Sequence, residues 1–218
     1  MRQIVLAVMI ALLCICAAVV LTLNCETLYY LDMELLQIEE MSGFSEEVIR
    51  ENYGRLIRYN LLWNREPLNL TLRMSEYGRI HFIEVKRIFD AIQVMLGLSA
   101  AGILGLGYSE MKKKNYGFLI KGGILSIVLP IITAGGIALN WERAFVIFHE
   151  IFFQNDYWIF DEYTDPIIKM LPDTYFMHCA VMIIVLILVF STGCILVGKY
   201  LNSVQEKSQE KVDTQGMV

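Results

Sequence analysis

All three histidines of the chain lie where a polar segment meets an apolar one, and all three fall on the same predicted side of a membrane. His81 precedes the second apolar stretch, His149 lies between the third and fourth stretches, and His178 stands at the head of the fourth. Histidine has an unperturbed pKa of about 6.5, so it is the usual side chain for proton transfer at neutral pH. The three positions therefore predict acid–base chemistry at a membrane boundary.

The composition indicates the kind of protein that must position these histidines. Of the 218 residues, 56% are hydrophobic and only 19% are charged, and the mean hydropathy is +0.51. A chain this apolar is typical of membrane proteins, in which a spanning helix needs about 20 apolar residues. Four stretches are predicted to span: 4–23, 91–108 lengthened by the apolar residues of 85–89, 118–139 and 176–197.

The first stretch is predicted to be a permanent anchor rather than a cleaved signal peptide. Arg2 and the apolar run behind it are typical of a signal peptide, but the run is longer than a usual signal core. Cys25 follows Asn24 rather than a small residue, which argues against a lipoprotein processing site.

Basic residues in short segments predict the orientation, because lysine and arginine resist translocation. Arg2, the lysines at 112–114 and the basic tail that begins at Lys199 place both termini in the cytoplasm. Residues 24–84 and 140–175 then form an extracytoplasmic cap. The fold class is a mainly α membrane protein with four transmembrane helices.

The chain is interpreted as a single membrane domain over residues 1–203, followed by a polar tail over 204–218 that is predicted to be disordered. A net charge of −5 gives no reason to expect a nucleic-acid partner. Most of the five cysteines lie in or beside the spans, so no disulfide framework is expected. Only a disulfide between Cys25 and Cys179 is left open as a possibility.

Two kinds of element are predicted in the first cap segment. Residues 45–63 have apolar side chains near helical spacing behind Ser45, a typical capping residue, and are predicted to form an amphipathic helix on or near the bilayer. In 64–82, leucines alternate with polar residues, which predicts short strands. A helical period resumes at Phe82, so His81 is expected just before or on the first turn of the second spanning helix.

The second cap segment carries charged side chains among aromatic ones over residues 148–166. An aromatic belt at the level of the lipid headgroups is one interpretation. A site in which polar side chains gather around His149 is the other. His149 and Glu150 resemble the start of a zinc-protease motif, but Phe153 stands where the second histidine ligand is needed.

No resident metal or other cofactor is predicted, although the spacing leaves open a zinc site built from His81, His149 and an acidic residue. No serine or cysteine signature of a covalent nucleophile occurs. In acyl chemistry, the substrate would therefore bring its own nucleophile.

Two blocks of the sequence resemble the bacterial lipoprotein intramolecular transacylase family. They are ENYGRLIRYNLLWNREPLNL followed by YGRIHFIEVKRIF, and FHEIFFQNDYWIFDEYTDPIIKMLPDTYF. The resemblance covers most of both cap segments. It implies a bacterial multi-pass plasma-membrane enzyme with its active site facing outside. Such enzymes move one acyl chain from the glyceryl ester of a diacylglyceryl-modified lipoprotein to the α-amino group of its cysteine, and leave a lyso-form lipoprotein.

By this similarity, His81 and His149 are the catalytic candidates. We expect one of them to act as general base and the other to stabilise the oxyanion or protonate the leaving glyceryl oxygen, and the sequence does not assign the two roles. His178 is tied to no catalytic role. The candidates for an oxyanion donor or for orienting a histidine are Glu84, Arg143, Glu150, Asn155, Asp156 and Tyr157.

Three other functions are weighed beside this one. A non-enzymatic membrane protein that binds lipids or lipoproteins explains the aromatic cap equally well, but not the accumulation of histidines. A metal-dependent membrane hydrolase requires the zinc site. A transporter is disfavoured because the spans carry few ionisable residues. The expected partners are diacylglyceryl-modified lipoproteins as substrates and membrane lipids.

Overall fold

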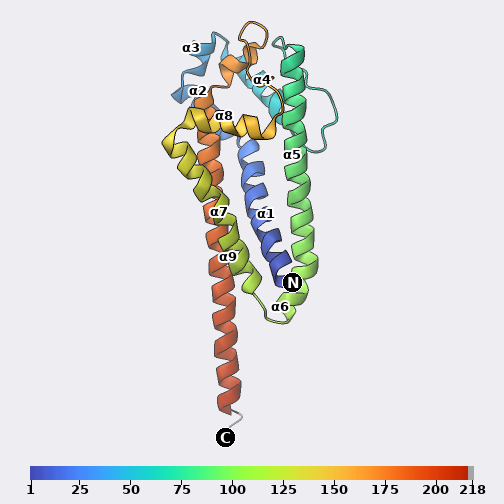
Figure 1. Cartoon of the computed structure of the whole chain (residues 1–218), viewed down its shortest axis with the longest axis vertical. Helices are drawn as coiled ribbons and strands as arrows, with labels where there is room; N and C mark the ends of the chain where they lie inside the picture. The colour runs from blue at the N-terminus through green and yellow to red at the C-terminus, as the bar shows by residue number, and fades with distance from the viewer. Residues whose placement is uncertain (216–218) are drawn as a thin grey trace. The chain divides into compact units, whose positions relative to one another are not determined.

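Helices make up all the regular structure that the computed structural model describes (Figure 1). It describes the backbone of residues 1–215, with the side chains of Leu129 and of residues beyond 208 outside the description. Four helical segments are long and apolar enough to cross a membrane, which confirms the predicted number of spans. They are α1 (Arg2–Leu23); α5 (Glu76–Gly102), continued by a π-helical turn (Ile103–Gly107) and α6 (Tyr108–Lys112); α7 (Gly117–Leu139); and α9 (Asp173–Gln215).

The second span begins well before the predicted residue 85, because a side chain caps α5 in the polar segment ahead of it. The Ser75 hydroxyl accepts a hydrogen bond from the Gly78 backbone N–H at 2.9 Å, which is the usual N-cap arrangement. The helix consequently extends through His81 into the apolar stretch. His81 lies in the second turn of α5 rather than before it.

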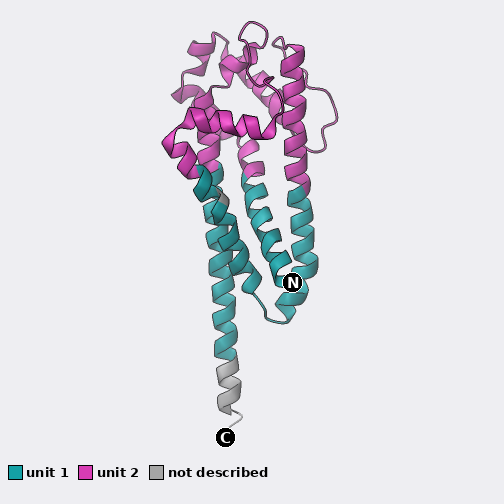
Figure 2. Ribbon diagram, in the orientation of Figure 1, with its two compact units in different colours: residues 1–18, 95–133, 183–218 teal, residues 19–94, 134–182 magenta. Residues whose placement is uncertain are grey.

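The chain divides into two compact units, and each of the four long segments contributes residues to both (Figure 2). Unit 1 comprises residues 1–18, 95–133 and the chain from 183 onward, and unit 2 comprises residues 19–94 and 134–182.

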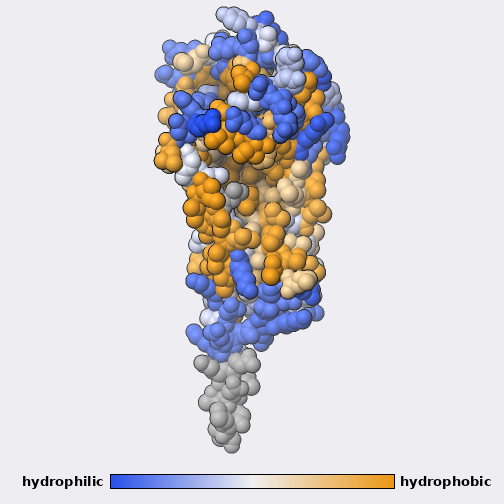
Figure 3. All heavy atoms as spheres, viewed as in Figure 1, coloured by the Kyte–Doolittle hydropathy of each residue, from blue (hydrophilic) through white to orange (hydrophobic). Residues whose placement is uncertain are grey.

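Unit 1 is built from closely packed spanning helices. A side chain at Gly123 would place its Cβ 2.7 Å from the Ser191 carbonyl oxygen, so glycine lets α7 and α9 approach there. The buried Ser126 and Ser191 hydroxyls lie 2.6 Å apart across the same contact. Hydrophobic side chains cover most of the face of unit 1 seen in Figure 3, and hydrophilic ones gather near α6. This distribution is typical of helices that face lipid.

Polar side chains join the N-terminus to the loop after the second span at one end of unit 1. Gln3 donates a hydrogen bond to Glu110 at 2.9 Å, and Arg2 and Lys113 each lie 3.7 Å from the same carboxylate. Arg2 and the basic loop thus share one end of this unit, as their predicted location on one side of the membrane requires.

The structure describes α9 as helical through Gln215, and the disorder expected of the tail over 204–218 stays a prediction. Residues 204–215 contain no proline or glycine and are rich in glutamate, lysine and glutamine, which favour helix. Residues 216–218 of the predicted tail lie outside the described residues.

Unit 2 has its own hydrophobic core, formed mainly by α2 (Glu26–Leu35), α3 (Ile38–Ser42), α4 (Glu46–Tyr59), a 3₁₀ turn (Pro166–Met170) and the first turns of α9. The rings of Tyr29 and Tyr53 stack with centroids 3.7 Å apart. Each buried hydroxyl finds a partner, since Tyr29 donates to the Met170 carbonyl at 2.8 Å and Tyr53 lies 2.9 Å from the Tyr175 hydroxyl. Aromatic stacking and satisfied hydroxyls together tie these segments into one core.

The predicted amphipathic helix is present as α4, and Ser45 caps it by accepting from the Val48 N–H at 3.5 Å. Its expected place on or near the bilayer stays a prediction, but the structure shows what covers its apolar face. The apolar residues Tyr53, Leu56 and Ile57 are buried in the core of unit 2, so protein covers this face of the helix. An amphipathic pattern predicts a buried face but does not distinguish lipid from protein as its cover.

The short strands predicted in 64–82 are absent, because no strand occurs in the part of the chain that the structure describes. A side chain supplies the hydrogen bonds that a partner strand would have made. Asn52 of α4 is fully buried; its amide oxygen accepts from the Thr71 N–H at 2.8 Å, and its amide nitrogen donates to the Thr71 hydroxyl at 2.6 Å. The alternating leucines consequently belong to a loop that is hydrogen-bonded to α4.

The five cysteines are all free thiols, Cys25 and Cys179 among them.

Candidate active site

Two of the three histidines meet in unit 2. His81 lies in the second turn of α5, and His149 lies in the last turn of α8 (Trp141–Phe152), a helix that begins directly after α7 (Figure 1). Their ring centroids are 6.1 Å apart, and the two residues are only 7% and 8% exposed. The structure thus brings together the two residues selected from the sequence as catalytic candidates.

Aromatic rings enclose both imidazoles. The centroid of His81 lies 4.7 Å from that of Phe153 and 5.4 Å from that of Phe160. His149 stacks on Trp158 with centroids 4.4 Å apart. Such walls exclude water, so a charge that develops between the imidazoles would be weakly screened.

The hydrogen bonds of His149 define which nitrogen is free to act as a base. Its Nδ1 lies 2.8 Å from the Phe145 carbonyl oxygen, which can only accept, so Nδ1 carries the hydrogen and Nε2 carries the lone pair. Burial lowers the pKa of His149, and the bond to the Phe145 carbonyl opposes that shift in part. A histidine with a lowered pKa is neutral at neutral pH, which is the form required of a general base.

A short series of hydrogen bonds begins at Glu84, one helical turn after His81. Glu84 accepts a hydrogen bond from the Asn155 side-chain amide at 2.9 Å, and the Asn155 oxygen accepts from the Tyr157 backbone N–H at 3.1 Å. The Tyr157 ring stacks on Tyr77 of α5 with centroids 4.5 Å apart. Three of the predicted supporting residues therefore form one series of contacts that joins α5 to the loop after α8.

The chain matches the family model described as "Lipoprotein intramolecular transacylase Lit" over residues 4–176. It belongs to the lipoprotein intramolecular transacylase family. The structure resembles the solved Lit of Bacillus cereus, a membrane-integral protein, with 38% sequence identity, a TM-score of 0.91 and coverage of 95% of this chain and 96% of that one. No curated protein matches the chain.

Two variants of the Bacillus cereus Lit, in which one histidine is replaced, give similar values. The arginine variant is 37% identical with a TM-score of 0.86, and 95% of this chain and 93% of that one are covered. The alanine variant is 37% identical with a TM-score of 0.84, and 95% of this chain and 94% of that one are covered. The predicted resemblance to the lipoprotein intramolecular transacylases is thus confirmed, and the family match includes both cap segments.

Three predicted supporting residues of this family member do not join the imidazole pair. Arg143, Glu150 and Asp156 are exposed, and within residues 1–208 none of their side chains forms a hydrogen bond or ion pair with either imidazole. Glu150 is adjacent to His149 and Arg143 is six positions before it, so both project from other sides of α8. Closeness in sequence suggested these residues; helical geometry separates Arg143 and Glu150 from the imidazoles, and Asp156 lies in the loop beyond α8.

Asp165, which was not among the residues selected from the sequence, fixes the start of α5. This carboxylate is 3% exposed, accepts from the Ser75 backbone N–H at 2.7 Å and accepts from the Thr164 hydroxyl at 2.7 Å. A side chain at Gly78 would overlap the same carboxylate. An acidic residue directly before Pro166 was the available indication of a turn in which a carboxylate binds backbone N–H groups.

His178, for which the sequence predicts no role, pairs with Asp32, which was not selected from the sequence either. The Nδ1 of His178 lies 2.8 Å from one oxygen of Asp32 and 2.9 Å from the other. Asp32 is 3% exposed and lies on the face of α2 that also buries Tyr29 and Met33. An acidic residue at buried helical spacing was the indication that it needs a partner.

Replacing His178 with alanine is expected to lower the free energy of unfolding by about 1–3 kcal/mol, because it leaves a buried carboxylate without a donor. Thermal unfolding in detergent measures the change. In an Asp32→Asn background the same replacement is expected to cost less, since the charge is already gone. Equal costs in the two backgrounds would show that the pair is not coupled.

Metal ligands are not gathered at the imidazole pair. The residues that the structure describes contain no group of three or more histidine, cysteine or acidic side chains placed to hold a metal ion. The zinc arrangement considered from the sequence thus finds no third ligand placed beside the two imidazoles among these residues.

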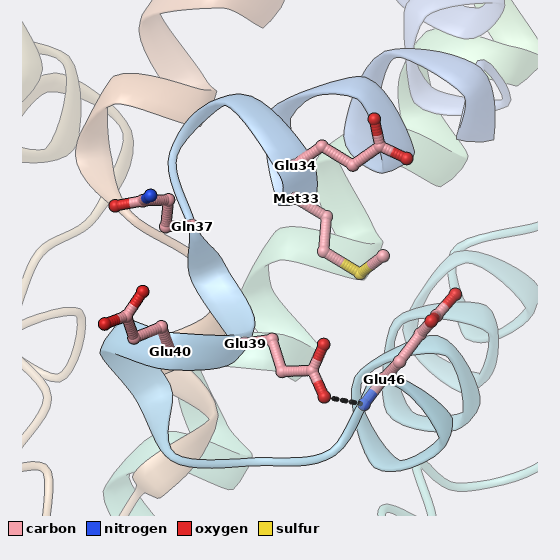
Figure 4. Close-up of a pocket in the computed structure, with 6 residues that line it drawn as sticks. All are labelled: Met33, Glu34, Gln37, Glu39, Glu40 and Glu46. Carbon is pink, nitrogen blue, oxygen red and sulfur yellow. Dashed lines mark hydrogen bonds between the residues drawn. The ribbon is translucent and has the colours of Figure 1, made fainter.

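A separate hollow of about 380 Å³ lies on α2, α3 and α4 (Figure 4). Within it the Glu46 backbone N–H donates to Glu39 at 3.2 Å. The hollow is acidic, is lined by no histidine and lies apart from the residues selected for the reaction, so the imidazole pair remains the candidate active site. Its lining residues are Met33, Glu34, Gln37, Glu39, Glu40 and Glu46.

Proposed function

We propose that this chain transfers an acyl chain within a diacylglyceryl-modified lipoprotein, from the glyceryl ester to the α-amino group of the lipidated cysteine. The product is the lyso-form lipoprotein. The observation that carries this proposal is the buried, closely spaced pair His81 and His149 in a member of the lipoprotein intramolecular transacylase family. The family name supplies the reaction type and the substrate class.

In the proposed mechanism, His149 is the general base and His81 is the electrophilic partner. The neutral amine of the substrate attacks the ester carbonyl carbon, so that a C–N bond forms and the carbonyl oxygen becomes an oxyanion. An N–H of His81 stabilises this oxyanion. Nε2 of His149 takes the proton from the attacking nitrogen and returns it to the glyceryl oxygen as the C–O bond breaks. The acyl chain has then moved from oxygen to nitrogen, and the enzyme is regenerated.

The reaction needs little from the protein beyond orientation and charge stabilisation. The amine and the ester belong to one molecule, so the protein has to hold the two groups together rather than capture a second substrate. Dry aromatic walls such as Phe153 and Trp158 favour this, because hydrogen bonds to the oxyanion are stronger where water is excluded.

We place the imidazole pair on the outer side of the bacterial plasma membrane, with both termini in the cytoplasm. The basic end of unit 1, which contains Arg2 and Lys113, supports this orientation. Membrane lipids and diacylglyceryl-modified lipoproteins are then the partners.

Mass spectrometry of N-terminal lipopeptides tests the function directly. A lipoprotein is expressed in a bacterium that lacks N-acylation, with and without this protein, and fragment ions locate each acyl chain. One acyl group on the cysteine nitrogen and one on the glyceryl unit is the expected product. Unchanged diacylglyceryl lipopeptide, with the protein present in the membrane, would instead support a binding protein without enzymatic activity.

The pH dependence of the reaction is expected to show the lowered pKa of His149. In a profile of log(kcat/KM), deprotonation of a substrate amine with a pKa of about 8 gives a slope of one on its acid side. The slope is expected to steepen to two only below about pH 6.5, the unperturbed pKa of histidine, because burial lowers the pKa of His149. Steepening at or above that pH would contradict the assignment of a lowered pKa.

A further inference from the structure

We propose that Glu84 is the binding site for the primary ammonium group of the substrate cysteine. This inference rests on the proposed function and deepens it, since it assigns the group that receives the nucleophile. The sequence suggested Glu84 only as a residue that orients a histidine. Among the residues that the structure describes, Glu84 forms no hydrogen bond with either imidazole, so it does not orient a histidine by direct contact.

The decisive feature is that one oxygen of the Glu84 carboxylate accepts a hydrogen bond and the other has no donor. One Glu84 oxygen accepts from the Asn155 amide at 2.9 Å, whereas the other is buried and has no hydrogen-bond partner in the described part of the chain. The orientation of Asn155 is unambiguous, because its oxygen accepts from the Tyr157 backbone N–H at 3.1 Å. Burying a carboxylate oxygen without a donor is costly, so this position is suited to a ligand that brings one.

A second buried atom without a partner lies on the same face of α5. His81 is 7% exposed, and its Nδ1 forms no hydrogen bond within residues 1–208. Positions three apart are neighbours on a helix, so Glu84 follows His81 by one turn. The loop that carries Asn155 also carries Phe153, whose ring contacts His81 with centroids 4.7 Å apart. The open carboxylate oxygen therefore belongs to the same site as the imidazole pair.

Two basic side chains on adjacent turns of α5 are engaged elsewhere, and a third, Arg87, is exposed and forms no ion pair with Glu84 among the described residues. Arg79 pairs with Glu76, and Lys86 lies 3.1 Å from Asp90 and 3.1 Å from the Leu61 carbonyl oxygen. Among the described residues no cation pairs with Glu84. A donor from a ligand would satisfy this oxygen, and the α-ammonium group of the substrate, with three N–H bonds, is such a donor.

The proton balance of the reaction follows from this placement. The bound ammonium first loses one proton to solvent and becomes a neutral amine that still donates an N–H to Glu84. Its lone pair then attacks the ester carbonyl carbon. A second proton passes from nitrogen to His149 and on to the glyceryl oxygen as the C–O bond breaks. The amide product keeps one N–H, and the positive charge that Glu84 attracted is gone, which favours release.

Binding of two unreactive lipopeptides tests the proposal. Both carry ether-linked chains in place of esters; one has the free α-amino group, and the other has hydrogen in its place. In the wild-type protein the amine is expected to tighten binding about 10- to 100-fold, the range for a charge-assisted hydrogen bond. In Glu84→Gln this preference is expected to fall below about threefold. The matched control is Glu142→Gln, which makes the same replacement at an exposed carboxylate on α8 and is expected to keep the full preference.

Two further measurements separate a lost contact from a damaged fold. In the wild-type protein, but not in Glu84→Gln, the preference for the amine is expected to decline above about pH 8, where the ammonium group loses its charge. Asn155→Ala, which keeps the carboxylate but removes its anchor, is expected to reduce the preference partly. A full preference in Glu84→Gln, or none in the wild-type protein, would overturn the proposal.

Transfer on the ester form of the lipopeptide distinguishes this inference from the proposed function. Absence of N-acylation by the wild-type protein would refute the proposed function, whatever the ether analogues show. Transfer by the wild-type protein together with an amine preference that does not depend on Glu84 would refute only the inference.

Discussion

Replacing His149 with alanine is expected to lower acyl transfer by at least about 100-fold, the lower end of the contribution of general acid–base catalysis. The variant loses the only group in the pair whose free nitrogen is defined by a hydrogen bond, that of Nδ1 to the Phe145 carbonyl oxygen at 2.8 Å. Replacing His81 with alanine is expected to have a loss of similar size, since it removes the proposed oxyanion donor. The rate is measured by mass spectrometry of lipopeptide product against time.

The double variant shows whether the two histidines act as one unit. Groups that serve a single transition state are not additive, so losing both is expected to cost little more than losing one. His178→Ala is the matched control, because its imidazole pairs with Asp32 rather than with the reacting groups. It is expected to lower stability but to retain transfer at a temperature where it is folded. Full activity in both single variants would exclude the proposed mechanism.

The sequence predicted the four spans and the pair of histidines for the same physical reason. Long apolar stretches have no alternative to a spanning helix, and titratable residues at their ends are few enough to stand out. His81 and His149 were identifiable because each lies at a change from polar to apolar sequence. Their mutual distance was not, because it depends on how α8 folds back in unit 2.

The elements of the cap were harder to predict, because their hydrogen bonds join residues far apart in sequence. Alternation around Leu70 predicted a strand, but the buried amide of Asn52 supplies the hydrogen bonds that a neighbouring strand would have supplied. The pairs formed by Asp32 with His178 and by Asp165 with Ser75 were missed for the same reason. A carboxylate in a sequence shows that a partner is needed but not which residue provides it.

Gly78→Ala is expected to lower the free energy of unfolding by about 2–3 kcal/mol and to slow acyl transfer by about 100-fold. A Cβ at this position would overlap the Asp165 carboxylate, which is buried and binds both the Ser75 N–H and the Thr164 hydroxyl. Either the carboxylate leaves its donors or the first turn of α5 moves. His81 lies only one turn further along, so a shift of this turn displaces the imidazole from its partner.

Two comparisons identify the overlap as the cause. Gly97→Ala makes the same replacement in the same helix, where nothing lies within 4 Å of the added carbon, and is expected to be neutral or to stabilise by up to about 1 kcal/mol. In an Asp165→Ala background, Gly78→Ala is expected to add little, because the overlapping atoms are gone and the two changes are coupled. Thermal unfolding and transfer rates are measured on all four proteins of this cycle. Strict additivity would mean that the effect of Gly78→Ala does not pass through the Asp165 carboxylate, and the position of His81 would then depend on other contacts of α5.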